Sequence, residues 1–335
     1  MWAGGIRHAT GYGGIRMSVG CVIGVDLGGT KLLAAAVGAD LTVRHRAVRP
    51  ARGSDQQEVI DTLVDAIEEV RRATEAEVLA VGVGIPSLMD VARGVALTTV
   101  HLPIEGVPVR DLLAERLGLP VFVDNDANVA LLAEQRQGAA AGARHAVMLT
   151  LGTGVGGGVM ADGRLLRGAL GAAGELGHMV IDADGPPCFG ACPNHGCLEA
   201  MASGSALGRD ATAFARAHPA SALGRALAEG QEVTGALTTE LAHDGDPEAT
   251  ALIVRMGGLL GVGIANLVNI FNPEVVVVGG GVIAAGELLL EPARAVVAQR
   301  ALGPSRDAAR ILPARFGEES GMLGAGALAF DGLGA

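Results

Sequence analysis

Three of the four cysteines in this 335-residue chain, Cys188, Cys192 and Cys197, lie within a span of ten residues. Thiolates and imidazoles are the ligands that zinc prefers in tetrahedral structural sites, so a site with three cysteines and one histidine is one interpretation. Three unmetallated thiols are the other. The spacings do not match the C-x-x-C of a redox pair, and a disulfide is disfavoured in a chain so poor in cysteine. Spacing alone favours His195, between the last two cysteines, over His178 as the fourth ligand.

Carboxylates gather in the segment VDNDAN, where Asp124, Asn125 and Asp126 follow an apolar run. A carboxylate within hydrogen-bond reach of a hydroxyl can take its proton, which accelerates a reaction by about 10²- to 10⁴-fold. A general base is therefore one interpretation of these residues. The alternative is that Asp124 or Asp126 only caps a helix that begins near Asn128, a common role for aspartate.

Glycine-rich junctions follow three apolar runs, at residues 28–31, 152–157 and 280–282. Glycine lets backbone N–H groups close around phosphate oxygens, although it also favours tight hairpin turns. The second junction fits the dinucleotide fingerprint G-x-G-x-x-G, but a further strand follows it instead of the required helix. The first junction ends in Thr30-Lys31, which reverses the G-K-[ST] order of a phosphate-loop NTPase.

The order of apolar runs and turns predicts an α/β fold with two similar halves facing each other across a cleft. Strands are expected at 21–27, 32–39 and 41–49 as an antiparallel meander, followed by a helix over 57–73 and further strands at 78–86 and 121–126. A second meander is expected over 145–168, and another strand leads into the third glycine junction. The apolar segment 251–271 is interpreted as a buried helix.

Composition limits the possible partners and locations of the chain. A net charge of -11 argues against a nucleic-acid partner, because no surplus of cations exists to replace phosphate counterions. No uninterrupted apolar run reaches the roughly 18 to 20 residues of a membrane span, so no membrane association is expected. Residues 1–20 are predicted to form a disordered N-terminal extension without the apolar segment of a signal peptide, and a cytoplasmic location is expected.

Seven motifs occur here in the order found in the ROK family of sugar kinases and sugar-responsive repressors, and the chain resembles that family over residues 21–329. They are VDLGGTK, GVGIP, DNDANVA, LGTGVGGGV, GAAGELGH, the cysteine cluster with GCLEAMASG, and NPEVVVVGGG. The resemblance implies an actin-like (ribonuclease H-like) ATPase fold of two lobes with a cleft between them. Residues 21–130 with a C-terminal helix near 318–330 would form the smaller lobe, and residues 131–317 the larger one with a zinc loop.

The resemblance also implies roles for individual residues in binding ATP, Mg²⁺ and a hexose. Asp126 would be the general base, and Asp26 would hold Mg²⁺ directly or through water. The hexose hydroxyls would be bound by Asn125, Asp126, Glu175, His178 and Glu199. Phosphates would be bound by Gly28, Gly29, Thr30, Thr153 and Gly154, with Lys31 adding positive charge, and the adenosine by Gly280 and Gly281.

For the metal site, the resemblance favours His178 over His195 as the fourth ligand beside Cys188, Cys192 and Cys197, and implies a structural zinc ion. The chain departs from the family pattern at Ser87, where glycine is usual, and at His101, where asparagine is usual. Ser87 is predicted either to add a hydroxyl near the sugar or to reshape its loop. The Cys188–Cys192 spacing is two residues longer than the usual C-x-C.

The expected activity is hexokinase-type phosphoryl transfer from ATP, with glucose as the first candidate and glucose 6-phosphate as the product. Fructose, mannose, allose and N-acylated hexosamines are alternative substrates, and polyphosphate is an alternative donor. A sugar-responsive repressor is the other class, but fewer than twenty-five residues precede the hairpin that carries the first glycine junction, too few for a winged helix-turn-helix. A non-catalytic sugar-binding module would be expected to lose Asp126. A homodimer or a dimer of dimers is expected.

Overall fold

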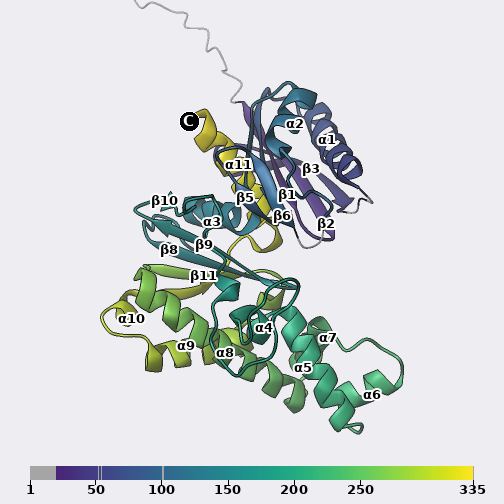
Figure 1. The fold of residues 1–335 in the computed structure, drawn as a ribbon, viewed down its shortest axis with the longest axis vertical. Helices are drawn as coiled ribbons and strands as arrows, with labels where there is room; N and C mark the ends of the chain where they lie inside the picture. The colour runs from purple at the N-terminus through teal and green to yellow at the C-terminus, as the bar shows by residue number, and fades with distance from the viewer. Residues whose placement is uncertain (1–19, 52, 54, 100–101, 335) are drawn as a thin grey trace, which may run out of the picture.

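The computed structural model describes residues 20–51, 53, 55–99 and 102–334. The predicted N-terminal extension, apart from residue 20, and the departure at His101 lie outside the described residues. Two five-stranded sheets lie one above the other, with helices between them and on their outer faces (Figure 1). This α/β architecture confirms the predicted fold class.

The first sheet joins an antiparallel meander to two parallel strands. Its strands are β1 (Cys21–Leu27), β2 (Lys31–Val37), β3 (Val43–Pro50), β4 (Val78–Ile85) and β7 (Val121–Asn125). They lie in the order β3-β2-β1-β4-β7, with β1, β4 and β7 parallel. The side chains of β1 alternate between two apolar clusters, one shared with the helix α1 (Gln56–Ala73) and the other with the helix α11 (Ser320–Leu333). Such alternation is typical of a strand buried on both faces.

The second sheet repeats this plan. Its strands are β8 (Ala146–Leu151), β9 (Val155–Ala161), β10 (Arg164–Leu165), β11 (Val275–Gly279) and β12 (Arg310–Pro313). The order β10-β9-β8-β11-β12 again joins an antiparallel meander to parallel strands. The predicted second meander and the strand before the third glycine junction are therefore confirmed.

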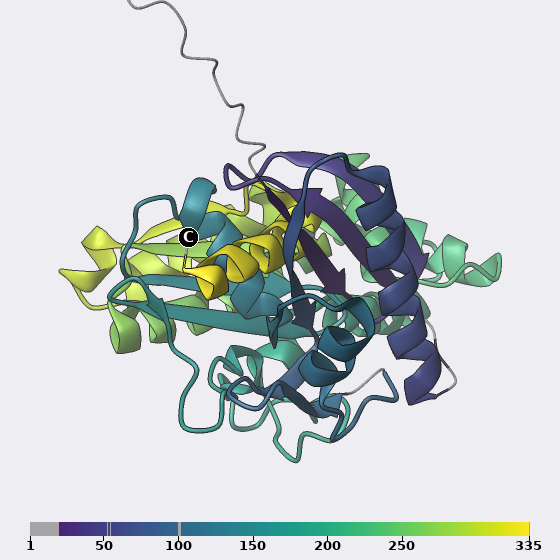
Figure 2. The same cartoon turned by 90° about the horizontal axis from the view of Figure 1, so that it is seen from above.

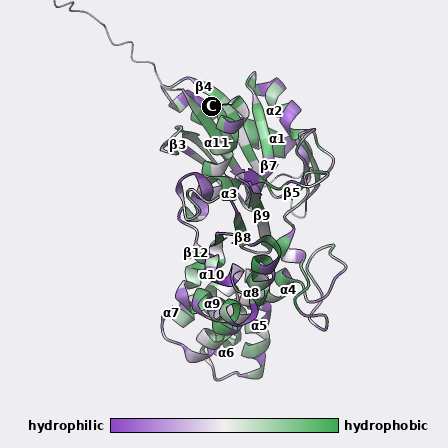
Figure 3. Ribbon diagram, turned by 90° about the vertical axis from the view of Figure 1, so that its left-hand side faces the viewer, coloured by the Kyte–Doolittle hydropathy of each residue, from purple (hydrophilic) through white to green (hydrophobic). Residues whose placement is uncertain are grey.

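Helices form three layers around the two sheets. The outer face of the first sheet packs against α1 (Gln56–Ala73) and α2 (Val109–Leu117), and the outer face of the second against α8 (Pro247–Phe271) and α9 (Glu287–Arg300). Between the sheets lie α3 (Asp126–Gln137) and α11 (Ser320–Leu333). Figure 2 shows α11, in yellow, beside the purple strands of the first sheet, and Figure 3 shows hydrophobic residues along the strands and α11.

Shorter elements complete the chain. They are β5 (Ser87–Asp90), β6 (Val95–Thr99), α4 (Leu198–Ala202), α5 (Gly204–Ala217), α6 (Ala222–Ala228), α7 (Gly235–His243), α10 (Ser305–Ala308), and the 3-10 turns η1 (Leu176–His178), η2 (Gly281–Ala285) and η3 (Gly317–Glu319). Strands β5 and β6 form a separate two-stranded sheet. Helices α5, α6 and α7 extend beside α8 at the far end of the second half (Figure 1).

The chain passes between the two sheets after α3 and again before α11, and Glu134 contacts both passages. Its fully buried carboxylate accepts hydrogen bonds from the backbone N–H groups of Ala139, Arg315 and Phe316, at 2.7 to 3.1 Å, and from the hydroxyl of Ser320 at 3.0 Å.

The predicted lobe boundary, between residues 130 and 131, falls inside α3, which packs against β4 and also against β8 and β9. Helix α3 is therefore shared between the two halves.

Helix α8 is long and apolar enough to cross a membrane by length and composition, although Arg255 interrupts its apolar run. This 25-residue helix has a mean hydropathy of 1.8 in its most apolar window, within the range of membrane spans. The interruption by Arg255 and several glycines does not lower that mean below this range. However, 56% of the window is buried inside the protein, where α8 packs on α4, α7 and α9. This burial is typical of the core helix of a globular domain, as predicted.

Candidate active site

The junction of β7 and α3 places three polar residues in succession between the two sheets. Asn125, not an aspartate, is the N-cap of α3, and its Oδ1 accepts hydrogen bonds from the N–H groups of Ala127 at 2.9 Å and Asn128 at 3.2 Å. The alternative that Asp124 or Asp126 provides the cap is therefore wrong, and the helix begins at Asp126, two residues earlier than predicted. Capping by Asn125 leaves the Asp126 carboxylate available for other contacts.

Two carboxyl groups interact at this junction, that of Asp26 from β1 and that of Asp126 from the start of α3. Burial raises the pKa of Asp126, although N–H groups such as that of Ala127 oppose the shift by hydrogen bonding. Burial, together with the negative charge of Asp126, raises the pKa of Asp26 from 3.8 to about 7, while Lys31 lowers it. Neighbouring carboxyl groups in a poorly solvated site resist ionising together. A cation at this position would relieve that repulsion, which suits the predicted role of Asp26.

The N-terminal end of α11 lies directly against Asp26. A side chain at Gly321 would collide with the Asp26 carboxyl group, so the close approach requires glycine. The ammonium of Lys31 lies 3.2 Å from Glu318, in the turn that precedes α11, and both side chains are exposed. The positive charge of Lys31 therefore has a carboxylate partner at the start of α11.

The first two glycine junctions form hairpin turns at equivalent positions of the two sheets. In the β1–β2 turn, the Gly28 N–H donates to the Lys31 carbonyl at 2.9 Å, and Gly29 and Thr30 lie at the tip. In the β8–β9 turn, Gly152 N–H donates to the Gly154 carbonyl at 2.9 Å, and Thr153 is exposed. The third junction has Gly280 at φ 83° and an exposed Gly281. These turns present small residues and backbone N–H groups, as a phosphate site requires.

The ligand atoms of His178, Cys188, Cys192 and Cys197 all lie within 4.8 Å of one another. Cys188 Sγ is 3.7 Å from His178 Nδ1, and Cys192 Sγ is 3.9 Å from Cys197 Sγ. His195 is exposed, and its ring faces the Gly185 carbonyl at 3.3 Å. The donor set suits a tetrahedral zinc ion, and the geometry favours His178 as its histidine.

Two carboxylates connect this cluster to the predicted sugar site. Glu199 Oε1 lies 3.8 Å from Cys188 Sγ, and its Oε2 accepts the Val155 N–H at 2.8 Å. A side chain at Gly154 would collide with this carboxylate. Glu175 Oε2 lies 3.9 Å from His178 Nε2, and burial raises the pKa of Glu175, with the negative charges of Asp126 and Glu199 adding to the shift. Glu175, Glu199 and Asp126 are thus neighbours in space.

Ser87 is buried, and its hydroxyl points into the β5–β6 pair. The hydroxyl lies within donating distance of the backbone carbonyls of Leu88, at 2.8 Å, and Thr98, at 3.0 Å. The Ser87 carbonyl accepts a hydrogen bond from Asn125 Nδ2 at 3.3 Å. Of its two predicted roles, the structure favours the reshaped loop over a hydroxyl offered to the sugar, because the hydroxyl proton already has backbone acceptors.

Sequence reasoning did not single out Arg167, whose Nε donates to Asp124 Oδ2 at 2.8 Å. Its only sequence signal is its place ahead of the GAAGELGH motif, which says nothing about a partner forty-three residues away.

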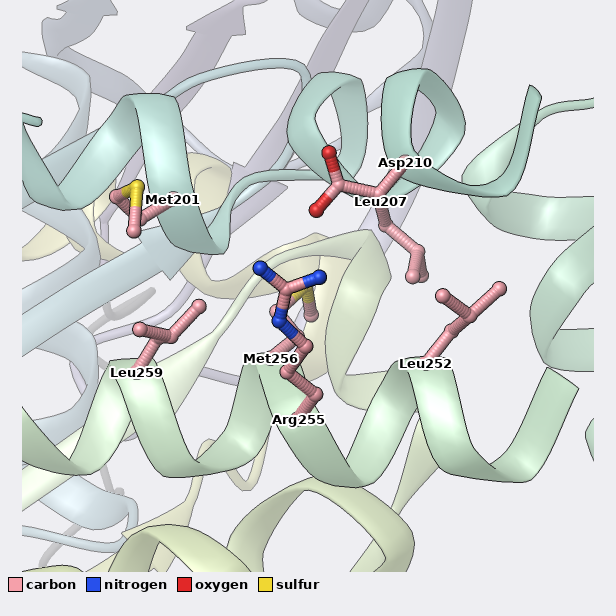
Figure 4. A pocket seen from close by; sticks show the side chains of 7 residues that line it. All are labelled: Met201, Leu207, Asp210, Leu252, Arg255, Met256 and Leu259. Atoms are coloured by element: carbon pink, nitrogen blue, oxygen red, sulfur yellow. The ribbon is translucent and has the colours of Figure 1, made fainter. Parts of the chain in front are cut away.

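Two hollows elsewhere on the surface contain none of the predicted site residues. Figure 4 shows one between α4, α5 and α8, where Arg255 and Asp210 point toward one another; it is lined by Met201, Leu207, Asp210, Leu252, Arg255, Met256 and Leu259.

Comparisons with known proteins match nearly the whole described chain. The ROK family profile matches residues 22–331. A glucokinase of Halalkalibacterium halodurans is 35% identical over 309 residues, covering 91% of this chain and 93% of the relative. The crystal structure of a ROK family glucokinase from Streptomyces griseus with glucose and AMPPNP matches this chain with a TM-score of 0.83 at 34% identity. The match covers 93% of this chain and 100% of that one. A xylose repressor of Caldicellulosiruptor bescii is 32% identical over 303 residues, covering 85% of this chain and 72% of the repressor.

Proposed function

The chain belongs to the ROK family, and on this premise we propose that it is a glucokinase that transfers the terminal phosphoryl group of ATP to glucose. The observation that carries the proposal is the position of Asp126, at the first residue of α3 and close enough to Asp26 to raise the pKa of that carboxyl group. Similarity to glucokinases over more than nine-tenths of the chain supports the same activity. The 6-hydroxyl of glucose is the proposed acceptor.

Asp126 acts as the general base in this proposal. It accepts the proton of the sugar hydroxyl as the oxygen attacks the terminal phosphorus, while Asn125 is held beside it by the α3 cap and the Ser87 carbonyl. Glu175, His178 and Glu199 bind the other sugar hydroxyls. A buried site built from such acceptors discriminates strongly, because a missing hydroxyl leaves one of them without a partner.

The phosphates of ATP are bound by the two hairpin turns, with Gly28, Gly29 and Thr30 on one side and Thr153 and Gly154 on the other. Gly280 and Gly281 contact the adenosine. Asp26 would hold Mg²⁺, an ion that prefers hard oxygen ligands and neutralises phosphate charge. Lys31 leaves Glu318 to add positive charge when a nucleotide is bound. Phosphoryl transfer needs mainly such positioning and charge neutralisation.

Zinc has a structural role in the proposal, held by His178, Cys188, Cys192 and Cys197. With four protein ligands, the ion would have no open position for a reacting water. Its effect would be to fix Glu199 and His178, because Glu199 contacts Cys188 and His178 belongs to both the metal shell and the sugar site.

Two further features complete the proposal. The chain acts in the cytoplasm, and it forms a homodimer or a dimer of dimers. Ile270 and Leu302 are exposed, at 65% and 71%, and their segments are joined by a hydrogen bond from the Leu302 N–H to Asn269 Oδ1. Exposed apolar side chains of this kind support association. Light scattering on the purified chain, combined with the Ile270→Asp variant, tests the assembly: the substitution is expected to lower the mass.

A coupled assay of ADP release over a panel of hexoses, with and without Mg²⁺, tests the activity. Turnover on glucose that requires Mg²⁺ is expected, with slower turnover on fructose, mannose, allose and N-acylated hexosamines. Polyphosphate in place of ATP, with glucose 6-phosphate as the measured product, tests the donor. Sugar binding without turnover on any hexose would contradict the proposal and favour a regulator like the xylose repressor.

A further inference from the structure

A buried ion pair joins the edge of the second sheet to the end of the first. Asp124, at the end of β7, is fully buried, and its Oδ2 accepts the Arg167 Nε–H at 2.8 Å. Arg167 follows β10 at the edge of the second sheet, where the neighbouring Leu166 N–H donates to the Val159 carbonyl at 2.8 Å. The two charged groups thus belong to different sheets, and the pair is a contact between the two halves.

Asp124 in turn holds the turn that carries the proposed base. Its Oδ1 accepts hydrogen bonds from the N–H of Asn125 at 2.8 Å and from Asn128 Nδ2 at 2.9 Å. Within the described part of the chain, Asn128 Oδ1 is buried without a hydrogen-bond partner. Leaving such an atom unpaired is unfavourable, and the amide orientation that leaves it so is the one that serves Asp124.

Arg167 is also connected to the proposed sugar site through its own segment. Its carbonyl accepts the Ala173 N–H at 3.0 Å, which closes a loop that leads directly to Glu175. Its side chain is 35% exposed, so the guanidinium faces solvent on one side and the buried Asp124 on the other. Water can therefore solvate part of the guanidinium, whereas the buried Asp124 carboxylate relies, within the described residues, on the contacts given above.

We propose that Arg167 is a positioning residue for the phosphoryl transfer put forward above. By pairing with Asp124 across the two halves, it fixes the Asn125–Asp126 turn and so keeps the base correctly placed. The inference rests on the proposed function, and it adds a contact between the halves that orients the base. Arg167 itself touches neither sugar nor phosphate.

Four variants test this role: Arg167→Gln, Arg167→Lys, Asp124→Asn and the double variant D124N/R167Q. Arg164→Gln is the matched control, because Arg164 is an exposed arginine on β10 only three residues away. Thermal stability, kcat and the KM values for glucose and ATP are measured for each. Arg167→Gln is expected to lower kcat by about 10- to 100-fold, as a small misplacement of a reacting group does, with little change in the KM for ATP.

Arg167→Lys is expected to recover part of the lost kcat, because lysine keeps the charge but not the planar donor geometry. The double variant is expected to lose about as much kcat as Arg167→Gln alone, since both substitutions break the same contact. Arg164→Gln is expected to match the wild type. A structural role alone would lower the melting temperature without separating kcat from KM.

Turnover by the wild type is measured first, because its absence contradicts the proposed function, whereas an unchanged kcat in a folded Arg167→Gln variant contradicts only the positioning role. Should that variant not fold, the double variant replaces it, since a neutral pair leaves no buried charge without a partner. A wild-type kcat in the double variant would likewise overturn the proposal.

Discussion

The two hairpin turns that face the proposed nucleotide occupy the same place in two sheets of the same strand order, yet they carry different chemistry. Asp26 is the last residue but one of β1 and pairs with Leu33 of β2; Thr150 is the last but one of β8 and pairs with Gly156 of β9. One position thus has a carboxyl group, and its pKa is raised to about 7 by burial and by the charge of Asp126. The other position has an uncharged hydroxyl.

The difference indicates that the fold is repeated while the chemistry is divided. The first half supplies the carboxylates Asp26, Asp124 and Asp126, all at the ends of its parallel strands, where ligands bind in open α/β sheets. The second half supplies backbone N–H groups and the thiol cluster, which orients the groups proposed to recognise the sugar. Substitutions at equivalent positions of the two halves should therefore have unequal effects.

The largest expected effect is that of Asp126→Asn, which removes the proposed base of the first half. We expect kcat to fall by about 10²- to 10⁴-fold, because the amide cannot accept the hydroxyl proton. Sugar affinity, measured by calorimetry, should change far less, and the melting temperature should not fall. Turnover within a few-fold of the wild type would remove Asp126 from this role.

The paired substitutions Asp26→Asn and Thr150→Ala test the division directly. The first is expected to reduce turnover by about 10²-fold or more, because the site loses its metal-binding charge, and the second by less than about 10-fold. Initial rates over a range of Mg²⁺ concentrations provide the measurement. Equal losses at the two positions would show that the halves contribute alike.

Removal of zinc should affect the second half first. A chelator, or Cys197→Ser, is expected to lower the melting temperature by several degrees and to raise the KM for glucose, because Glu199 and His178 lose their fixed positions. Elemental analysis of protein purified without chelator should give one zinc per chain. His195→Ala is the matched control and should retain the metal; loss of zinc from that variant, but not from His178→Ala, would reverse the ligand assignment.

The stability of the nucleotide-free protein should depend on pH through Asp26. The folded chain keeps a proton on Asp26 up to about pH 7, whereas the unfolded chain loses it near the ordinary aspartate pKa of 3.8. The native state therefore binds more protons between these pH values, and the contribution of Asp26 to the free energy of unfolding falls as the pH rises through this window. Asp26→Asn should thus stabilise the protein at pH 8, by at most about 4 kcal/mol. Urea unfolding at pH 5 and pH 8 measures the change, and equal effects at the two pH values would contradict it.

The smallest expected effect is that of Glu134→Gln at the passages between the halves. An amide keeps one acceptor oxygen but turns the other into a donor, so at least one of the three backbone N–H groups held by Glu134 loses its partner. We expect a loss of about 1–3 kcal/mol in the free energy of unfolding, measured by urea titration, with kcat reduced only slightly. Glu240→Gln, in α7 far from the passages, is the control, and equal losses in the two variants would contradict this role.

Much of the fold was predictable because its signals are local. Apolar runs that end in glycine mark β1, β8 and β11, and the period of residues 57–73 marks α1. The cysteine spacing predicted a metal site, but not which histidine completes it, since spacing pointed to His195 and the structure brings His178 to the thiols.

The remaining features depend on contacts between residues distant in sequence. Arg167 meets Asp124 across forty-three positions, and Glu134 meets Phe316 across 182. Neither pair has a motif. An aspartate cap for α3 was an open alternative because asparagine and aspartate both suit that position, and only the backbone shows that Asn125 occupies it.

The most direct test of the account is a crystal structure with glucose and a non-hydrolysable ATP analogue bound. The account predicts an Asp126 carboxylate oxygen within about 2.6–3.2 Å of the 6-hydroxyl oxygen of glucose. The terminal phosphate should lie on the opposite side of that hydroxyl oxygen. A sugar bound with all of its hydroxyls away from Asp126, or a nucleotide bound outside the two hairpin turns, would contradict it.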